Sequence, residues 1–190
     1  MTDKITDKKP TRWFDQDGVL AFYDYADYTP YGKEALSRYL TKESHMFRHL
    51  GTYPNMIRAF ELLYAESRHT KDFYTKILTG VLAGFLQAEH TIDKYFWCSQ
   101  TIKGFCQEDF FCVSVEKHSA VASDIWDLTK HDILIDDYNP NLYHWHDRGG
   151  TSVKCINQLN SENPDFPHIN VYWKPERIVE ELKNIMKNII

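Results

Sequence analysis

The sequence lacks a long hydrophobic run. Its longest nearly apolar stretch is ILTGVLAGFL at residues 77–86, whereas a membrane-spanning helix needs about 20 such residues. Residues 1–12 are polar and charged rather than apolar, so they do not resemble a secretory signal. We therefore expect a soluble, cytoplasmic protein with no membrane partner.

Blocks of basic residues are also absent. Lys and Arg together number 22 against 27 Asp and Glu, which gives a formal charge of −5. Proteins that grip a phosphate backbone need clustered positive charge. A nucleic acid polymer is therefore not an expected partner.

Cysteine is scarce, and no two cysteines have the C-x-x-C spacing of a metal or redox site. We expect buried or half-buried thiols in a reducing compartment. The four cysteines are Cys98, Cys106, Cys112 and Cys155.

Hydrophobic residues make up 43% of the 190 residues, which is enough to build the core of one domain with or without an insertion. Short runs rich in aromatic and β-branched residues alternate with helical patterns, and this alternation predicts an α/β fold with a doubly wound, mostly parallel sheet. The predicted strands are residues 12–14, 73–78, 110–115, 133–135 and 152–156, and the predicted helices are 55–64, 91–102, 140–147 and 175–189.

The helix predicted at 140–147 has the clearest boundary signals. Asn139 is placed to be its N-cap, Pro140 its first residue, and Gly149 follows its end. Trp145 within it is predicted to pack in the core. His144 and His146 lie on different sides of such a helix, so we interpret them as surface or half-buried histidines rather than a metal pair.

The predicted domain organisation has three parts. Residues 1–11 form a loose arm. Residues 24–51 separate the first strand from the helix expected to follow it, and they carry a helical segment of their own near 33–40. We interpret 24–51 as a small helical cap inserted into a core formed by 12–23 and 52–190. Charged cap residues such as Lys33, Arg38 and Arg48 either contact a substrate or are simply solvated.

Chemically active side chains follow the ends of several predicted strands. A D-x-D-G turn alone is often only a surface loop, and the later ligands of an EF-hand are missing here. In a doubly wound sheet, however, ligands bind beyond the carboxyl ends of the strands, and four strand ends would bring polar groups to that edge. These groups are Asp15, Asp17, Thr79, Lys117, Asp136 and Asp137.

This set of side chains suits phosphoryl transfer. Carboxylates brought together repel one another unless a divalent cation lies between them, and Mg²⁺ prefers such oxygen ligands together with substrate phosphate. One carboxylate can then attack phosphorus while a second transfers protons. A hydroxyl and an ammonium group would hold the phosphate oxygens.

Three motifs carry a resemblance to a known family. FDQDGVLA, ILTG and DILIDDYNPNLYHWHDRGG resemble motifs of the haloacid dehalogenase-like (HAD) phosphatase superfamily, in particular its 5'(3')-deoxyribonucleotidase-like branch with bacterial and phage relatives. The similarity extends from residue 12 to about residue 160. It includes the segment IDKYFWC, in which Lys94 and Trp97 match a K-x-x-W pattern of that branch.

The resemblance implies a role for each acidic residue. Asp15 would be the nucleophile and a Mg²⁺ ligand, and Asp17 the general acid and base, with its backbone carbonyl on the metal. Asp136 would complete the metal ligands, with Asp137 in a supporting role. An acid at position 17 favours a phosphatase over the transport ATPases of the superfamily, which have Thr there.

The resemblance also implies phosphate and base contacts. Thr79 would bind the transferring phosphate, and Lys117 would bridge the nucleophile and the phosphate. Lys130 is an alternative, because it precedes Asp136 more closely, but we prefer Lys117 because it directly follows a predicted strand. Tyr23 is placed either to stack on a nucleobase or to pack between cap and core.

We thus expect a Mg²⁺-dependent phosphomonoester hydrolase, acting through an aspartyl-phosphate on a small molecule such as a (deoxy)ribonucleoside monophosphate. The alternatives are a HAD phosphatase for another small phosphorylated metabolite and a non-catalytic nucleotide-binding protein. Base and sugar preference and the oligomeric state do not follow from the sequence.

Overall fold

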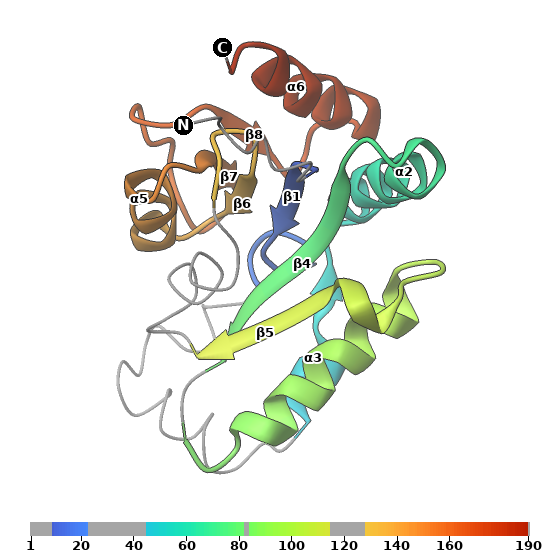
Figure 1. Cartoon of the computed structure of the whole chain (residues 1–190). Helices are drawn as coiled ribbons and strands as arrows, with labels where there is room; N and C mark the ends of the chain where they lie inside the picture. Colours follow the sequence, from blue (N-terminus) through green and yellow to red (C-terminus); the bar gives the residue numbers. More distant parts are fainter. Residues whose placement is uncertain (1–8, 23–44, 82–83, 115–127, 190) are drawn as a thin grey trace, which may run out of the picture.

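The computed structural model describes residues 9–22, 45–81, 84–114 and 128–189. Six strands form one sheet in the order β5-β4-β1-β6-β7-β8, and every neighbouring pair is parallel (Figure 1). The strands are β1 (Thr11–Phe14), β4 (Tyr74–Val81), β5 (Phe110–Ser114), β6 (Ile133–Asp136), β7 (Thr151–Ile156) and β8 (His168–Asn170).

This sheet confirms the predicted doubly wound α/β fold. The chain starts at the central strand β1, adds β4 and β5 on one side, and then crosses to add β6, β7 and β8 on the other. The strand order therefore reverses beside β1, which is where such folds place their ligands.

Helices cover both faces of the sheet (Figure 1). On one face, α2, α3 and α6 pack against apolar side chains of the central strands, and on the other face α5 does so. Their bounds are α2 (Pro54–Thr70), α3 (Gln87–Thr101), α5 (Asn139–Asp147) and α6 (Pro175–Lys187). The four helices predicted at 55–64, 91–102, 140–147 and 175–189 all exist, and α2 and α3 begin earlier or end later than expected.

Two adjacent residues of β1 show how both faces are filled. Trp13 faces α5 and contacts Trp145 edge to face, with ring centroids 6.5 Å apart. Phe14 points to the opposite face, where its ring lies 5.1 Å from that of Phe60 on α2. Alternating side chains of one strand thus enter two separate hydrophobic clusters, as expected of a central parallel strand.

The predicted cap lies mostly outside the described residues, as does its helical segment near 33–40. The structure describes residues 45–51 of the predicted cap, together with the core up to Phe22 and from Thr52 onward. Strand β2 (Ala21–Phe22) pairs antiparallel with β3 (Gly51–Thr52), and the short 3-10 helix η3 (Met46–His49) precedes β3. The chain therefore leaves the core and returns to it at neighbouring points.

Asn139 is not the N-cap of α5, so that prediction was wrong. The helix begins at Asn139 itself, Tyr138 occupies the cap position, and no side chain caps the helix. The side-chain oxygen of Asn139 instead accepts a hydrogen bond from Lys154 Nζ at 2.9 Å. A competing partner on β7 thus overrides the local signal.

The predictions for Trp145, for the two histidines of α5 and for the burial of the cysteines are confirmed. Trp145 is fully buried, and its Nε1 donates to the Asp132 carbonyl at 3.1 Å, whereas His144 and His146 are exposed. All four cysteines are free, two of them buried and two half-buried. Among the described residues, no helix is both long and apolar enough to cross a bilayer.

Candidate active site

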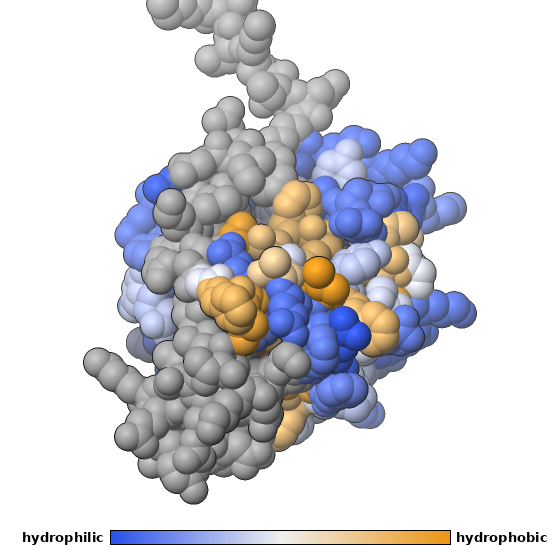
Figure 2. All heavy atoms as spheres, turned by 90° about the horizontal axis from the view of Figure 1, so that it is seen from below, coloured by the Kyte–Doolittle hydropathy of each residue, from blue (hydrophilic) through white to orange (hydrophobic). Residues whose placement is uncertain are grey.

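The carboxyl ends of β1, β4 and β6 meet at one edge of the sheet. Asp15 directly follows β1, Thr79 lies near the end of β4, and Asp136 is the last residue of β6. Figure 2 views the molecule from the end to which β1 and β4 point, and hydrophobic residues gather there beside hydrophilic ones. Three segments far apart in the sequence thus place polar groups together.

The turn after β1 requires its glycine. Gly18 has a φ of +75°, a conformation that residues with a Cβ rarely adopt. A Cβ at this position would also lie 2.3 Å from Oδ2 of Asp137, which is far too close. The glycine of the D-x-D-G motif therefore lets the turn approach the acidic end of β6.

Three carboxylates form the centre of the site. Asp15, Asp136 and Asp137 each offer one oxygen, and these three oxygens lie within 4.8 Å of one another. Burial raises the pKa of Asp15 well above its ordinary value, and the neighbouring carboxylates, first that of Asp136, raise it further. Without a cation, negative charge on Asp15 is unfavourable here.

The Asp136 and Asp137 carboxyl groups are held by hydrogen bonds from the chain around them. Asp136 accepts from the Tyr138 backbone N–H at 2.7 Å and from Asn141 Nδ2 at 2.9 Å. Asp137 accepts from Asn157 Nδ2 at 3.0 Å. Burial nevertheless raises the pKa of Asp136 to about 7 and that of Asp137 to about 6.

Two oxygens of the motif lack such partners. Asp15 Oδ1 and Asp17 Oδ1 are buried, and neither has a hydrogen-bond partner within the part of the chain that the structure describes. Buried polar atoms are nearly always paired. Unpaired carboxylate oxygens beside two further carboxylates fit a hard divalent cation such as Mg²⁺, which takes oxygen ligands.

Lys94 enters the site from α3. It is fully buried, and its Nζ donates to Asp17 Oδ2 at 2.5 Å and to Thr79 Oγ1 at 2.9 Å. Because Thr79 accepts this bond, its own hydroxyl hydrogen can donate to another group. The site therefore holds a fixed positive charge and a hydroxyl donor beside the two catalytic candidates.

The role of Lys94 was not predicted, although the K-x-x-W pattern includes it. A signal was present in the sequence, because His90, Lys94, Trp97 and Cys98 have the spacing of one helix face. All four are buried. A lysine within an otherwise buried face needs a carboxylate or similar partner, which its position alone could have indicated.

The structure thus brings together Asp15, Asp17, Thr79, Asp136 and Asp137. The other two predicted site residues, Lys117 and Tyr23, lie outside the described residues, and their roles stay predictions. The alternative Lys130 is exposed and lies in the turn before β6, at the opposite end of that strand from the carboxylates.

Several solved structures with a similar fold are haloacid dehalogenase-like hydrolases. A hydrolase of this family from Streptococcus pneumoniae matches with a TM-score of 0.57 and 13% identity, over 92% of this chain and 98% of that one. The D,D-heptose 1,7-bisphosphate phosphatase of B. bronchiseptica, complexed with magnesium and phosphate, matches with a TM-score of 0.56 and 11% identity, again over 92% and 98%.

A hydrolase of the same family from Xanthomonas campestris has a TM-score of 0.55 and 13% identity, over 95% of this chain and 97% of that one. No protein-family model and no curated protein sequence matches the chain. At these identities the likeness concerns the fold, and the fold of this chain is that of haloacid dehalogenase-like hydrolases.

Proposed function

We propose that this protein is a Mg²⁺-dependent phosphomonoester hydrolase that forms an aspartyl-phosphate on Asp15. The observation that carries the proposal is the buried Asp15 carboxylate, whose Oδ1 has no partner among the described residues and which lies beside Asp136 and Asp137. Asp15, Asp136 and the Asp17 carbonyl would hold the metal, with Asp137 close by. The bound Mg²⁺ would neutralise phosphate charge and so allow an anionic nucleophile to approach.

In the first step, an Asp15 carboxylate oxygen attacks phosphorus, and the bond from phosphorus to the ester oxygen breaks. Asp17 gives a proton to the departing oxygen, which leaves as an alcohol. The Lys94 ammonium and the Thr79 hydroxyl lie beside Asp17. Both can therefore donate to the phosphate oxygens on which charge develops.

In the second step, water attacks the phosphorus of the aspartyl-phosphate, and Asp17 accepts the proton of that water. The bond between phosphorus and Asp15 breaks, which returns the Asp15 carboxylate and releases inorganic phosphate. Asp17 is suited to both transfers because it lies two residues from the nucleophile and has one buried oxygen without a partner among the described residues.

We further propose a nucleoside monophosphate as the substrate. Support comes from the motifs around Asp15 and Asp136 that resemble deoxyribonucleotidases, and from Tyr23, which directly follows the described end of β2 at Phe22. A similar fold also occurs in a heptose bisphosphate phosphatase and in a dehalogenase. The fold alone therefore does not distinguish a nucleotide from another phosphorylated metabolite.

A substrate panel tests this proposal. Ribo- and deoxyribonucleoside monophosphates, sugar phosphates and a small aryl phosphate are assayed with Mg²⁺, after treatment with EDTA, and after Mg²⁺ is added back. We expect hydrolysis only with Mg²⁺, and the highest kcat/KM for a nucleoside monophosphate. Full activity in protein shown to be metal-free would contradict the mechanism, and preference for a sugar phosphate would contradict the substrate class.

A further inference from the structure

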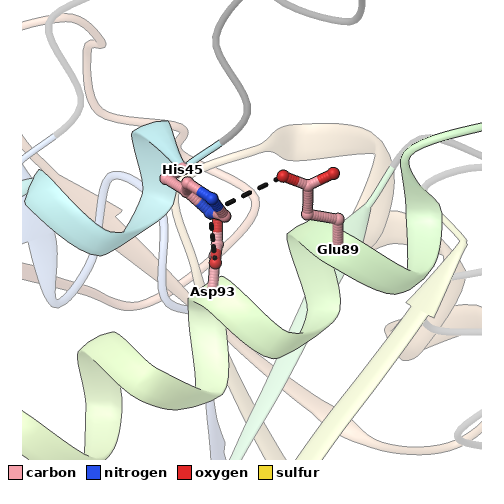
Figure 3. A group of neighbouring side chains, drawn as sticks. All are labelled: His45, Glu89 and Asp93. Carbon is pink, nitrogen blue, oxygen red and sulfur yellow. Dashed lines mark hydrogen bonds and ion pairs between the residues drawn. The ribbon is translucent and has the colours of Figure 1, made fainter.

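A second group of charged residues lies beside the proposed active site, where η3 packs on α3 (Figure 3). The buried carboxylate of Asp93 pairs with Arg48 Nε at 2.5 Å and with His45 Nδ1 at 3.1 Å. Figure 3 shows His45 pointing between Asp93 and Glu89, and Glu89 lies 3.6 Å from the same nitrogen. Two basic residues of the returning chain are thus held by one helix.

This group is not suited to a metal ion, although its ligand atoms lie within 4.8 Å of one another. The Arg48 guanidinium already neutralises Asp93, and its direct contact would repel a divalent cation. Arg48 is thus neither simply solvated nor free to contact a substrate, because it pairs with Asp93. The group fastens η3 to α3.

The next residue of α3 is Lys94, and η3 also contacts it. The ring centroid of Phe47 lies 4.4 Å from Lys94 Nζ, which is a cation–π distance. Phe47 is itself buried and packs against the His90 ring at 5.1 Å. The Lys94 ammonium therefore lies between an aromatic face from η3 and the oxygens of Asp17 and Thr79.

A third tie fixes the end of this segment. Trp97 Nε1 donates to the Leu50 carbonyl at 2.8 Å, and the Arg48 guanidinium lies over the Phe96 ring at 4.9 Å. Lys94 and Trp97 of the K-x-x-W pattern thus both contribute where η3 packs on α3. Lys94 reaches the site, and Trp97 holds the chain whose aromatic ring covers Lys94.

We propose that Phe47 and Arg48 are positioning residues for Lys94. A lysine side chain is long and flexible, so fixing it in one position costs rotamer entropy. Phe47 supplies the face against which the ammonium rests, and the pair between Arg48 and Asp93 keeps Phe47 there. The effect on turnover rests on the proposed function, whereas the effect on Lys94 geometry does not.

The experiment records the NMR signals of the lysine ε-CH2 and Nζ groups in the full chain, with the Lys94 signal assigned by its loss in Lys94→Met. In the wild type, the Phe47 ring current should move this signal upfield. Phe47→Leu should abolish the shift, and Phe47→Tyr should retain it. Arg48→Met should reduce it, Arg48→Lys should restore part of it, and the control Arg58→Met should leave it unchanged.

The same variants are then assayed with the small aryl phosphate. Phe47→Leu and Arg48→Met should lower kcat by about fivefold to thirtyfold, the range of a desolvated cation–π contact. Arg58 is the matched control, because it pairs with Glu61 on the exposed side of α2. Phe47→Tyr should recover most of the rate, which a general loss of packing would not allow.

The two proposals fail in different ways. An unchanged Lys94 signal in folded Phe47→Leu and Arg48→Met would overturn the positioning role, whatever the activity. If the signal moves but kcat stays at the wild-type value, Phe47 and Arg48 position Lys94 without affecting catalysis, and the proposed effect on turnover is wrong. A wild type that hydrolyses no phosphomonoester would overturn the proposed function, while the NMR comparison would still test the geometry.

Discussion

Two clusters of acidic side chains in the described structure have similar geometry but differ in the partners of their carboxylates. One carboxylate oxygen from each of Asp15, Asp136 and Asp137 lies within 4.8 Å of the other two. The ligand atoms of His45, Glu89 and Asp93 lie within the same distance of one another. In the second cluster, Arg48 and His45 satisfy the buried Asp93. In the first, Asp15 keeps a buried oxygen without a partner among the described residues.

The charge around the first cluster makes the difference clearer. Among the described residues, the ammonium groups near the carboxylates of Asp15, Asp17, Asp136 and Asp137 are those of Lys94 and Lys154. Lys154 Nζ donates to the Asp137 carbonyl at 2.5 Å and so supports the acidic loop from behind. A cluster with more carboxylates than nearby ammonium groups suits a divalent cation, whereas the paired Asp93 of the second cluster joins two segments. The partners of the carboxylates, and not ligand spacing, distinguish the two clusters.

The largest expected effect is that of Asp15→Asn. Removing the nucleophile should lower kcat by more than about a hundredfold, equivalent to about 2.7 kcal/mol of transition-state stabilisation, in a protein that still folds. The matched change in the second cluster, Glu89→Gln, should leave kcat close to the wild-type value. Steady-state kinetics with folding checked by circular dichroism measure both, and a smaller loss would remove Asp15 from its role.

Lys94→Met should reduce kcat by about a hundredfold, because one fixed donor to the developing phosphate charge is lost. Lys154 is the matched control, since it is buried like Lys94 but bonds behind the acidic loop rather than within the site. Lys154→Met should mainly lower the melting temperature. Equal kinetic losses in the two folded variants would show that Lys94 has no special place in the chemistry.

Tyr23→Ala tests whether the substrate carries a nucleobase. Stacking of a base on tyrosine contributes about 1–3 kcal/mol, so kcat/KM for nucleoside monophosphates should fall by about fivefold to a hundredfold. Hydrolysis of a small aryl phosphate should hardly change. An equal loss on both substrates would assign Tyr23 to structure and leave the nucleotidase proposal without its base contact.

The smallest effect concerns stability of the metal-free protein. The pKa of Asp136 is raised to about 7 and that of Asp137 to about 6, from 3.8, chiefly by burial. Between pH 4 and pH 7 the folded state therefore binds more protons than the unfolded state, and stability falls as the pH rises. We expect the melting temperature to decrease by several degrees across this window, and added Mg²⁺ to raise it most at pH 7.

A melting temperature that rises from pH 4 to pH 7 without metal would contradict these raised pKa values. Glu89→Gln, in the second cluster, should leave the Mg²⁺-induced rise intact, and Asp15→Asn should reduce it. This pair of variants locates the ion in one cluster rather than the other.

The sequence predicted the sheet well because its strands are buried on both faces. The central strands have continuous runs such as RWF and ILI, which depend little on tertiary context. Strand β8 (His168–Asn170) was missed because three residues after Pro167 are too short to show an alternating hydrophobic pattern. Only their pairing with β7 identifies them as a strand.

The positions of Asp15, Thr79 and Asp136 were predictable because strand ends determine them, whereas their roles stay predictions. The helix-face spacing around Lys94 indicated a buried lysine, but its partners Asp17 and Thr79 lie far away in the sequence, and no local pattern specifies them. The same holds for Asn139, whose cap signal competes with Lys154 on β7. Long-range partners thus account for both failures.

The stereochemical course at phosphorus tests the central claim most directly. The best substrate of the panel is prepared with a phosphate made chiral by oxygen isotopes and is hydrolysed in isotopically labelled water. Each in-line displacement inverts phosphorus, so attack by Asp15 followed by attack by water predicts net retention. Inversion would show that water attacks the substrate directly and would contradict an aspartyl-phosphate on Asp15.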